Sequence, residues 1–246
     1  MRFAAALGLL LLLLAGGGSV LAEDAPSLFS SPPENDEDLN QPQLHFSKMK
    51  AGKRNVLFVW AGIDQGDSER FREAMEAAKP IEEIWFFSPG GALEEGLEIG
   101  RIIRKHKFAT RIKGDFQCIS ACNFMFMGGT IRTIEPGGVF AVHMFANDIH
   151  KAIKEDVDAA LEDAQQHNAD HPDDKVDVDA RIEKVMDEDI KQVQQDAAQT
   201  AAEIARFLTE MELSLRFLTA FASIPNETPR ALSRDELRDF NIVNTD

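Results

Sequence analysis

Two short stretches are the most informative part of this sequence for its fold: Ser88-Pro89-Gly90-Gly91 and Cys118-Ile119-Ser120-Ala121-Cys122. An apolar, strand-like run at residues 81–87 precedes the first stretch, and residues 92–106 after it carry apolar side chains at helical spacing. Residues 108–113 form a second strand-like run. Strand, glycine turn, helix and strand together predict a βαβ unit whose two strands are parallel neighbours.

The glycine turn also indicates where chemistry could occur. Such a turn leaves backbone N–H groups unpaired just before a helix, where they can hold an anion or an oxyanion. Ser120 comes 29 positions after Gly91, at the predicted start of a short apolar helix, and His143 follows 23 positions later at the end of an apolar run. A neutral imidazole within hydrogen-bond reach can take the proton of a serine and make its hydroxyl nucleophilic. Ser120 is therefore a candidate nucleophile and His143 a candidate general base.

This order of motifs resembles the Clp-type serine proteases of the ClpP/crotonase superfamily. The resemblance covers roughly residues 55–143 and 225–243, and the double cysteine and secretory start are closest to the exported, periplasmic branch of the superfamily. It implies an α/β fold with a ClpP/crotonase-like ββα spiral core, parallel strands and a helical insertion. It also implies Ser120 as nucleophile, His143 as general base, and the N–H groups of Gly91 and Ala121 as oxyanion donors.

The third member of a catalytic triad departs from the family's pattern. The Clp pattern places an aspartate three or four positions before the serine of the closing Leu232-Ser233 pair, and Pro229 falls at that place here. Glu227 could orient His143 as an acid, Asn226 could do so as an amide, or the site could lack a third member. We take Glu227 as the candidate.

The only two cysteines of the chain, Cys118 and Cys122, flank Ser120. Positions i and i+4 of a helix lie close enough for a disulfide, and an exported protein meets an oxidising environment. Such a bridge would pin the backbone that carries Ser120. Two buried free thiols and a redox pair are the alternatives, although redox pairs commonly use a two-residue spacing.

The N-terminal residues 1–22 have the pattern of a signal peptide. Arg2 is the positive residue, residues 3–15 are the apolar core, and Val20-Leu21-Ala22 is a small-residue cleavage site. An uncleaved anchor is the alternative, because the apolar stretch is nearly long enough to span a bilayer. In both cases the body of the protein is expected to be exported. Cleavage after Ala22 would make it periplasmic or secreted, and any membrane association would run through an uncleaved N-terminal segment.

Residues 23–53 are polar, acidic and proline-bearing, which predicts a disordered linker, so the Clp-like α/β domain is expected to span residues 54–246. The net charge of the chain is −16, which argues against nucleic acid as a partner. The expected partners are instead a peptide or protein substrate and further copies of the chain.

Residues 147–218 form the predicted acidic helical insertion. Residues 148–196 carry 16 acidic and 6 basic side chains, a balance of −10. Helices are expected over residues 149–165 and 180–218, with residues 167–179 breaking the helical pattern. His167, His171 and nearby aspartates would suit a divalent cation, but a solvated loop is the simpler interpretation, so no metal or cofactor is expected. In the Clp resemblance this region makes oligomer contacts, which implies a homo-oligomer without implying a large ring.

Two helix starts and the C-terminal end can also be predicted from short motifs. Ser68 is the expected N-cap of a helix that runs to about residue 79, and Ser233 with Glu236 predicts a capping box for a helix over residues 234–240. Ile242 and Val243 are expected in a short last strand or an extended tail. Two functions follow from the whole sequence: a serine hydrolase, most simply a peptidase acting through a Ser120 acyl-enzyme, or a non-catalytic Clp-fold scaffold or binding protein.

Overall fold

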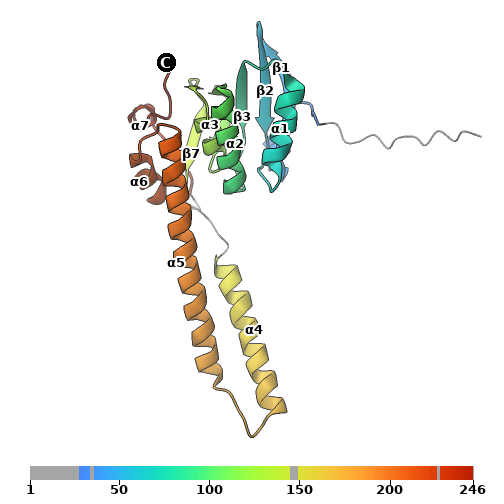
Figure 1. Cartoon of the computed structure of the whole chain (residues 1–246), viewed down its shortest axis with the longest axis vertical. Helices are drawn as coiled ribbons and strands as arrows, with labels where there is room; N and C mark the ends of the chain where they lie inside the picture. The colour runs from blue at the N-terminus through green and yellow to red at the C-terminus, as the bar shows by residue number, and fades with distance from the viewer. Residues whose placement is uncertain (1–27, 34–35, 145–148, 226–227, 246) are drawn as a thin grey trace, which may run out of the picture.

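A computed structural model describes residues 28–33, 36–144, 149–225 and 228–245. The predicted signal peptide, Asn226 and Glu227 lie outside these residues. An α/β body holds all the strands, and two long helices project from it (Figure 1). Within the described part of the chain, no helix combines the length and the apolar character that crossing a membrane requires.

The larger sheet has five strands in the order β1-β2-β3-β4-β6. β1 is antiparallel to β2, and every other neighbouring pair is parallel. The parallel pairing of β3 with β4 confirms the predicted βαβ unit. The strands are β1 (His45–Ala51), β2 (Arg54–Trp60), β3 (Glu83–Phe87), β4 (Ala109–Ile112) and β6 (Ile131–Ile134).

A smaller sheet carries the second motif. It has the order β5-β7-β8, with β5 (Gln117–Ile119) parallel to β7 (Val139–Val142) and β7 antiparallel to β8 (Arg230–Ala231). A single parallel bridge from Ser88 to Cys118 joins the two sheets. The residue after β3 and the strand before Ser120 are therefore hydrogen-bonded neighbours.

Alternation along β2 divides the core into two parts. Leu57 and Val59 face the main core, whereas Val56, Phe58 and Trp60 face a smaller cluster on the other side of the sheet. Helices cover the main core side and provide many of its remaining apolar residues. They are α1 (Asp67–Ala78), α2 (Leu93–His106), α3 (Cys122–Met127), α6 (Arg216–Ala222) and α7 (Arg234–Asp239).

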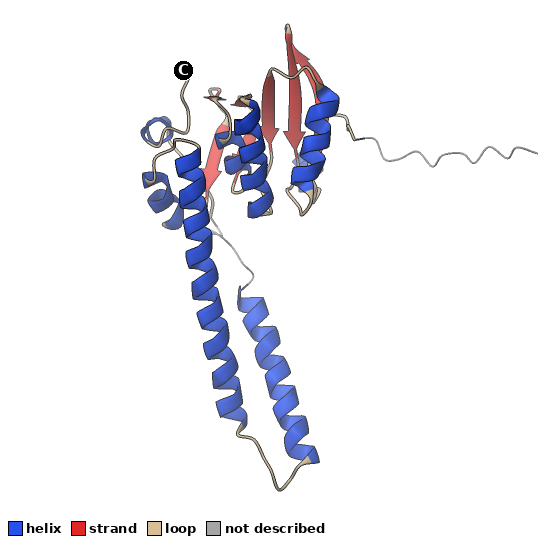
Figure 2. Cartoon of the chain, in the orientation of Figure 1, coloured by secondary structure: helices blue, strands red, loops and turns tan. Residues whose placement is uncertain are grey.

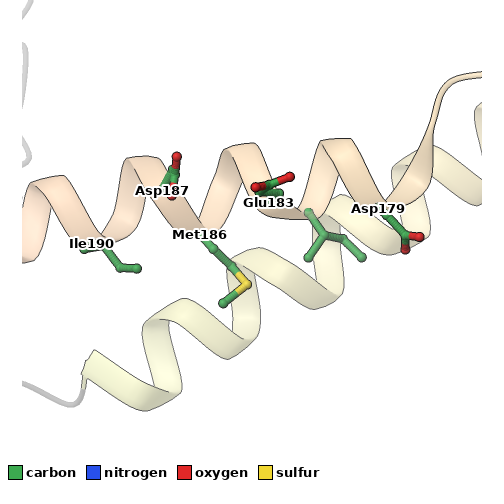
Figure 3. Close-up of a pocket in the computed structure, with 6 residues that line it drawn as sticks. Asp179, Glu183, Met186, Asp187 and Ile190 are labelled. Atoms are coloured by element: carbon green, nitrogen blue, oxygen red, sulfur yellow. The ribbon is translucent and has the colours of Figure 1, made fainter.

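The predicted insertion is a helical hairpin of α4 (Ile149–Asp170) and α5 (Val178–Glu210), and Figure 2 shows it extending away from the sheets. Only the C-terminal end of α5 enters the main core, through Ile204, Phe207 and Leu208. Farther out, Met186 and Ile190 are 42% and 45% exposed. They line a shallow hollow together with Asp179, Glu183 and Asp187 (Figure 3).

The prediction that residues 23–53 form a disordered linker is wrong for its second half. Residues 45–51 form β1, which pairs along its whole length with β2, and a 3-10 helix occupies Asp36–Asn40. Leu39, Leu44 and Phe46 are buried. The sequence did not reveal this edge strand because it follows an acidic, proline-bearing stretch and its own polar side chains alternate with apolar ones. Two of these polar residues are lysines, Lys48 and Lys50, which are typical of exposed sheet edges.

Several predicted helix boundaries also need correction. α4 continues to Asp170, so the break in the hairpin is limited to residues 171–177. The helix expected over residues 180–218 is two helices, because α5 ends at Glu210 and α6 begins at Arg216. Gly66, in the left-handed conformation, caps α1 in place of Ser68.

The C-terminal segment is held without a last strand. The capping box of Ser233 and Glu236 at the start of α7 is confirmed. Ile242 and Val243 are buried but pair with no strand among the described residues. Arg132, itself only 2% exposed, binds this segment by donating hydrogen bonds to the carbonyls of Asn241 and Ile242. Its burial lowers the pKa of Arg132 to about 10.

Candidate functional site

The glycine turn after β3 is fixed by close backbone approaches. Ser88 is fully buried, and its Oγ accepts a hydrogen bond of 3.1 Å from the Gly90 N–H. Gly90 has φ +96°, and a Cβ there would lie 2.6 Å from the carbonyl oxygen of Ile119. At Gly91, φ is +146° and a Cβ would lie 2.0 Å from the Ile63 carbonyl oxygen. Both positions therefore require glycine for conformational and steric reasons.

Ser120 lies in the turn between β5 and α3, with φ at +56°. The helix expected over residues 121–127 begins one residue later, at Cys122 with Ala121 as its N-cap, so Ser120 lies just before the N-cap. The left-handed backbone ends the strand sharply. It is held from both sides, since the Ser120 N–H donates to the Ala141 carbonyl (3.2 Å) and the Ser120 carbonyl accepts from the Asn123 N–H (3.0 Å). A left-handed residue that carries a Cβ is unfavourable by itself, and such residues concentrate at functional sites.

The N–H groups of Gly91 and Ala121 border the same pocket as Ser120. Neither group donates a hydrogen bond to any residue that the structure describes. Two free backbone N–H groups beside a serine are what an oxyanion hole needs.

His143 directly follows β7, the strand that pairs with β5. Its Nδ1 lies 2.7 Å from the Met144 carbonyl oxygen. A carbonyl can only accept, so this contact requires the proton on Nδ1 and leaves Nε2 as the basic nitrogen. No hydrogen bond joins Ser120 to His143 among the described residues, although both line one pocket.

That pocket has a volume of about 1020 Å³ and brings four of the predicted site residues together, namely Gly91, Ser120, Ala121 and His143. Its opposite wall is α5, through side chains that include Val193, Ala197 and Thr200. Glu227 lies outside the described residues and is not placed. Cys118 and Cys122 form a disulfide behind the serine.

The sequence did not predict that α5 would line the pocket of Ser120. Val193, Ala197 and Ile204 recur on one helical face, which predicted burial against the core or another subunit. Only Ile204 is buried in the core, whereas Val193 and Ala197 line the pocket. The helical periodicity could have found this face, but nothing in it indicates that the face would lie across from Ser120.

Carboxylates give the pocket a negative character. Glu94, Asp196 and Glu203 line it, and Glu203 lies 3.7 Å from Arg101. Nearby, Glu95 accepts hydrogen bonds from the Gly66 and Ser68 N–H groups and so ties the start of α2 to the start of α1. Burial by itself raises the pKa of Glu95, but these hydrogen bonds outweigh it and lower the pKa below the ordinary value.

The hairpin loop offers no metal centre in the part of the chain that is described, where no cluster of three or more His, Cys, Asp or Glu residues is suited to an ion. His167 and His171 have ring centroids 4.8 Å apart. The Nε2 of His167 lies 2.9 Å from the Asp174 carbonyl oxygen. The Asn168 side chain closes the loop by bonding both backbone groups of Val176. These contacts are those of a structured, solvated connection.

No protein-family model matches the chain, and no curated protein matches it. Among solved structures it is similar to a mutant of ClpP1 from Listeria monocytogenes, at 17% identity over 77% of this chain and 88% of that one, with a TM-score of 0.44. A mutant of the 1510-N membrane-bound stomatin-specific protease is 11% identical over 74% and 73% of the two chains, with a TM-score of 0.43. Methylmalonyl CoA decarboxylase complexed with 2S-carboxypropyl CoA is 12% identical over 80% and 87%, with a TM-score of 0.32.

At these identities and TM-scores the likeness concerns the fold alone. The chain is a mixed α/β protein with parallel strands, and its structural neighbours come from ClpP- and crotonase-type proteins.

Proposed function

We propose that this chain is an exported serine hydrolase that cleaves peptides through an acyl-enzyme on Ser120. One observation carries the proposal. A single pocket holds a serine in a left-handed strand-to-helix turn, a histidine with its proton on Nδ1, and two backbone N–H groups, and neither the histidine Nε2 nor these N–H groups have a hydrogen-bond partner among the described residues.

The chemistry assigns one role to each group. His143 Nε2 takes the proton of Ser120 as Oγ attacks the substrate carbonyl carbon, and the Gly91 and Ala121 N–H groups stabilise the resulting oxyanion. The imidazolium then gives the proton to the leaving amine. Water, activated by the same nitrogen, releases the acyl group from Ser120. The Met144 carbonyl holds Nδ1–H and stabilises the imidazolium in the absence of a described acid.

For this reaction to occur, Ser120 Oγ and His143 Nε2 must come within hydrogen-bond distance of each other. Hydrogen bonds between catalytic groups are often long in resting enzymes and tighten when substrate binds. His143 and Met144 follow β7 directly and lead toward α4, so a shift at this junction would move the imidazole without disturbing the sheet.

Export is supported by the N-terminal pattern and by the disulfide, because such bonds persist in oxidising compartments. A peptide is the proposed substrate class. It rests on the Clp resemblance, and the volume of the pocket is large enough for several residues of an extended chain.

A non-catalytic binding protein is the second candidate, and one observation favours it. Among the described residues, Ser120 and His143 share no hydrogen bond, and His143 is held by a backbone carbonyl instead of a carboxylate. In this case the pocket would bind a peptide without cleaving it.

Labelling with a fluorophosphonate probe separates the two candidates. We expect the protein without residues 1–22 to be labelled, Ser120→Ala to be unlabelled, and His143→Ala to be labelled roughly 100-fold or more slowly, because general-base catalysis contributes about that much. Ser223→Ala and His106→Ala are matched controls, since both side chains are exposed and lie outside the pocket. A folded wild type that stays unlabelled would contradict the hydrolase and favour the binding protein.

A further inference from the structure

We propose that the Cys118–Cys122 disulfide is a positioning group for Ser120, and that a dithiol reductant reversibly lowers the reactivity of the serine. The inference rests on the proposed hydrolase function and adds redox control to the same site.

The disulfide closes directly across the serine turn. It joins the middle residue of β5 to the first residue of α3, with Cα atoms 5.3 Å apart, and encloses only Ile119, Ser120 and Ala121. Both sulfurs belong to fully buried residues. The three enclosed residues include the candidate nucleophile and one candidate oxyanion donor, so the bridge constrains both.

Cys118 is also the residue through which the turn contacts the rest of the site. On one side it pairs with Ser88, where the Ser88 N–H donates to Gln117 (2.9 Å) and the Ile119 N–H donates to Ser88 (3.1 Å). On the other side it pairs with Phe140 of β7, the strand that leads to His143. The disulfide therefore connects α3 to the strand that lies between the glycine turn and the histidine.

The conformation of Ser120 explains why a covalent link would matter here. Its left-handed backbone is unfavourable for a residue with a Cβ, and a right-handed conformation would instead extend α3 toward β5. That change would rotate Ser120 Oγ and the Ala121 N–H away from their present directions. The bridge limits this change, because it keeps Cys118 and Cys122 at a fixed separation while the turn between them rearranges.

Reduction is a balanced exchange with a dithiol. One thiolate of the reductant attacks a protein sulfur, which forms a mixed disulfide and releases the other cysteine as a thiolate. The second thiolate of the reductant then attacks the reductant's own sulfur in the mixed disulfide and releases the remaining cysteine. The protein gains two electrons and two protons as two cysteine thiols, and the reductant leaves as its own disulfide. Since both cysteines are buried, the exchange requires a local opening of the turn and should be slow.

The chain has no other cysteine, so a reductant acts on this disulfide alone. The test therefore compares one protein in three states. Fluorophosphonate labelling rates are measured for the oxidised protein, for the protein reduced with dithiothreitol, and for the same sample after reoxidation. We expect reduction to slow labelling by about tenfold to 100-fold, since small misplacements of reacting groups have effects of this size, and reoxidation to restore the rate. The Cys118→Ala/Cys122→Ala double variant should show the slow rate and no response to dithiothreitol. Equal rates in the oxidised and reduced forms, or a fast double variant, would overturn the proposal.

Backbone amide hydrogen exchange, measured on the same samples, separates this inference from the proposed function. We expect reduction to speed exchange in residues 119–123 while β2 and β3 stay protected. If the oxidised protein takes no label, the hydrolase proposal fails, and the exchange alone decides the positioning role. Unchanged exchange in the turn overturns it. Faster exchange throughout the body also overturns it, because the bridge would then stabilise the whole fold instead of the serine turn.

Discussion

At the scale of single residues, Gly90 shows how closely the two motifs depend on each other. A Cβ on Gly90 would lie 2.8 Å from the Cβ of Ser120 and 3.0 Å from the Ala121 nitrogen. The glycine turn and the serine turn therefore pack backbone against backbone, and any side chain at Gly90 would separate them.

We expect Gly90→Ala to cost about 2–5 kcal/mol of unfolding free energy, from the left-handed conformation and from overpacking. Labelling at Ser120 should fall with it. Gly52→Ala is the matched control, because Gly52 has φ +63° but nothing within 4 Å of a Cβ. It should cost only about 1–2 kcal/mol and leave labelling unchanged. Urea unfolding and probe labelling measure both effects, and similar costs for the two variants would contradict this account.

At the scale of elements, α7 and β8 are joined by one carboxylate. Glu236 closes the capping box with Ser233 and receives two hydrogen bonds from Arg230 of β8, at 2.9 and 3.0 Å. The hydrogen bonds from Arg230, followed by that from the Ser233 N–H, lower the pKa of Glu236 to about 2. β8 in turn pairs with β7, the strand before His143, so this carboxylate supports the edge of the site.

The lowered pKa of Glu236 makes its contribution depend on pH. The folded-state pKa lies below the ordinary value of 4.5, so the stabilisation is present above that pH and is lost as the pH falls toward about 2. We expect Glu236→Gln to cost about 0.5–1 kcal/mol near neutral pH, the range of a partly exposed ion pair, and less at about pH 3. Urea unfolding of both proteins at the two pH values measures this. The pH dependence should become weaker in an Arg230→Gln background, where only the hydrogen bonds from Ser233 still lower the pKa of Glu236, and an undiminished dependence there would assign it to another group.

At the scale of the whole molecule, the hairpin is anchored at one end only. Ile204, Phe207 and Leu208 of α5 are buried in the main core, and α4 buries only Ala160 and Ala164 among its described side chains. Figure 3 shows Met186 and Ile190 of the outer part, which retain much of their exposure. The hairpin carries much of the negative charge of the chain, and its inner part forms a wall of the pocket.

This arrangement predicts a gradient of stability along α5. Segments with few buried contacts open locally at low free energy, so backbone amides in residues 180–190 should exchange about tenfold or more faster than those in residues 204–208 of the same helix. Hydrogen exchange measured by mass spectrometry would report both segments in one sample. Equal protection along the helix would indicate that the outer hairpin is covered in solution, for example by another copy of the chain.

The local parts of this protein could be predicted from the amino-acid sequence. The βαβ unit, its parallel strands, the glycine turn and the capping box of α7 follow from periodicity, turn chemistry and capping, which act between residues close in the chain. The local pattern did not reveal β1, because the pairing of an edge strand depends on its neighbour in the sheet.

The assembly of the site could not be predicted in this way, because it depends on contacts between distant segments. The left-handed turn at Ser120 depends on contacts with Ala141, Gly90 and Ser88, and the wall formed by α5 depends on where its buried end enters the core. The Met144 carbonyl that orients His143 belongs to the next residue, and Met144 is itself positioned by its N–H, which donates a hydrogen bond of 2.8 Å to the Ile224 carbonyl. These features join segments far apart in sequence, so their energies depend on packing and hydrogen bonds that no local pattern encodes.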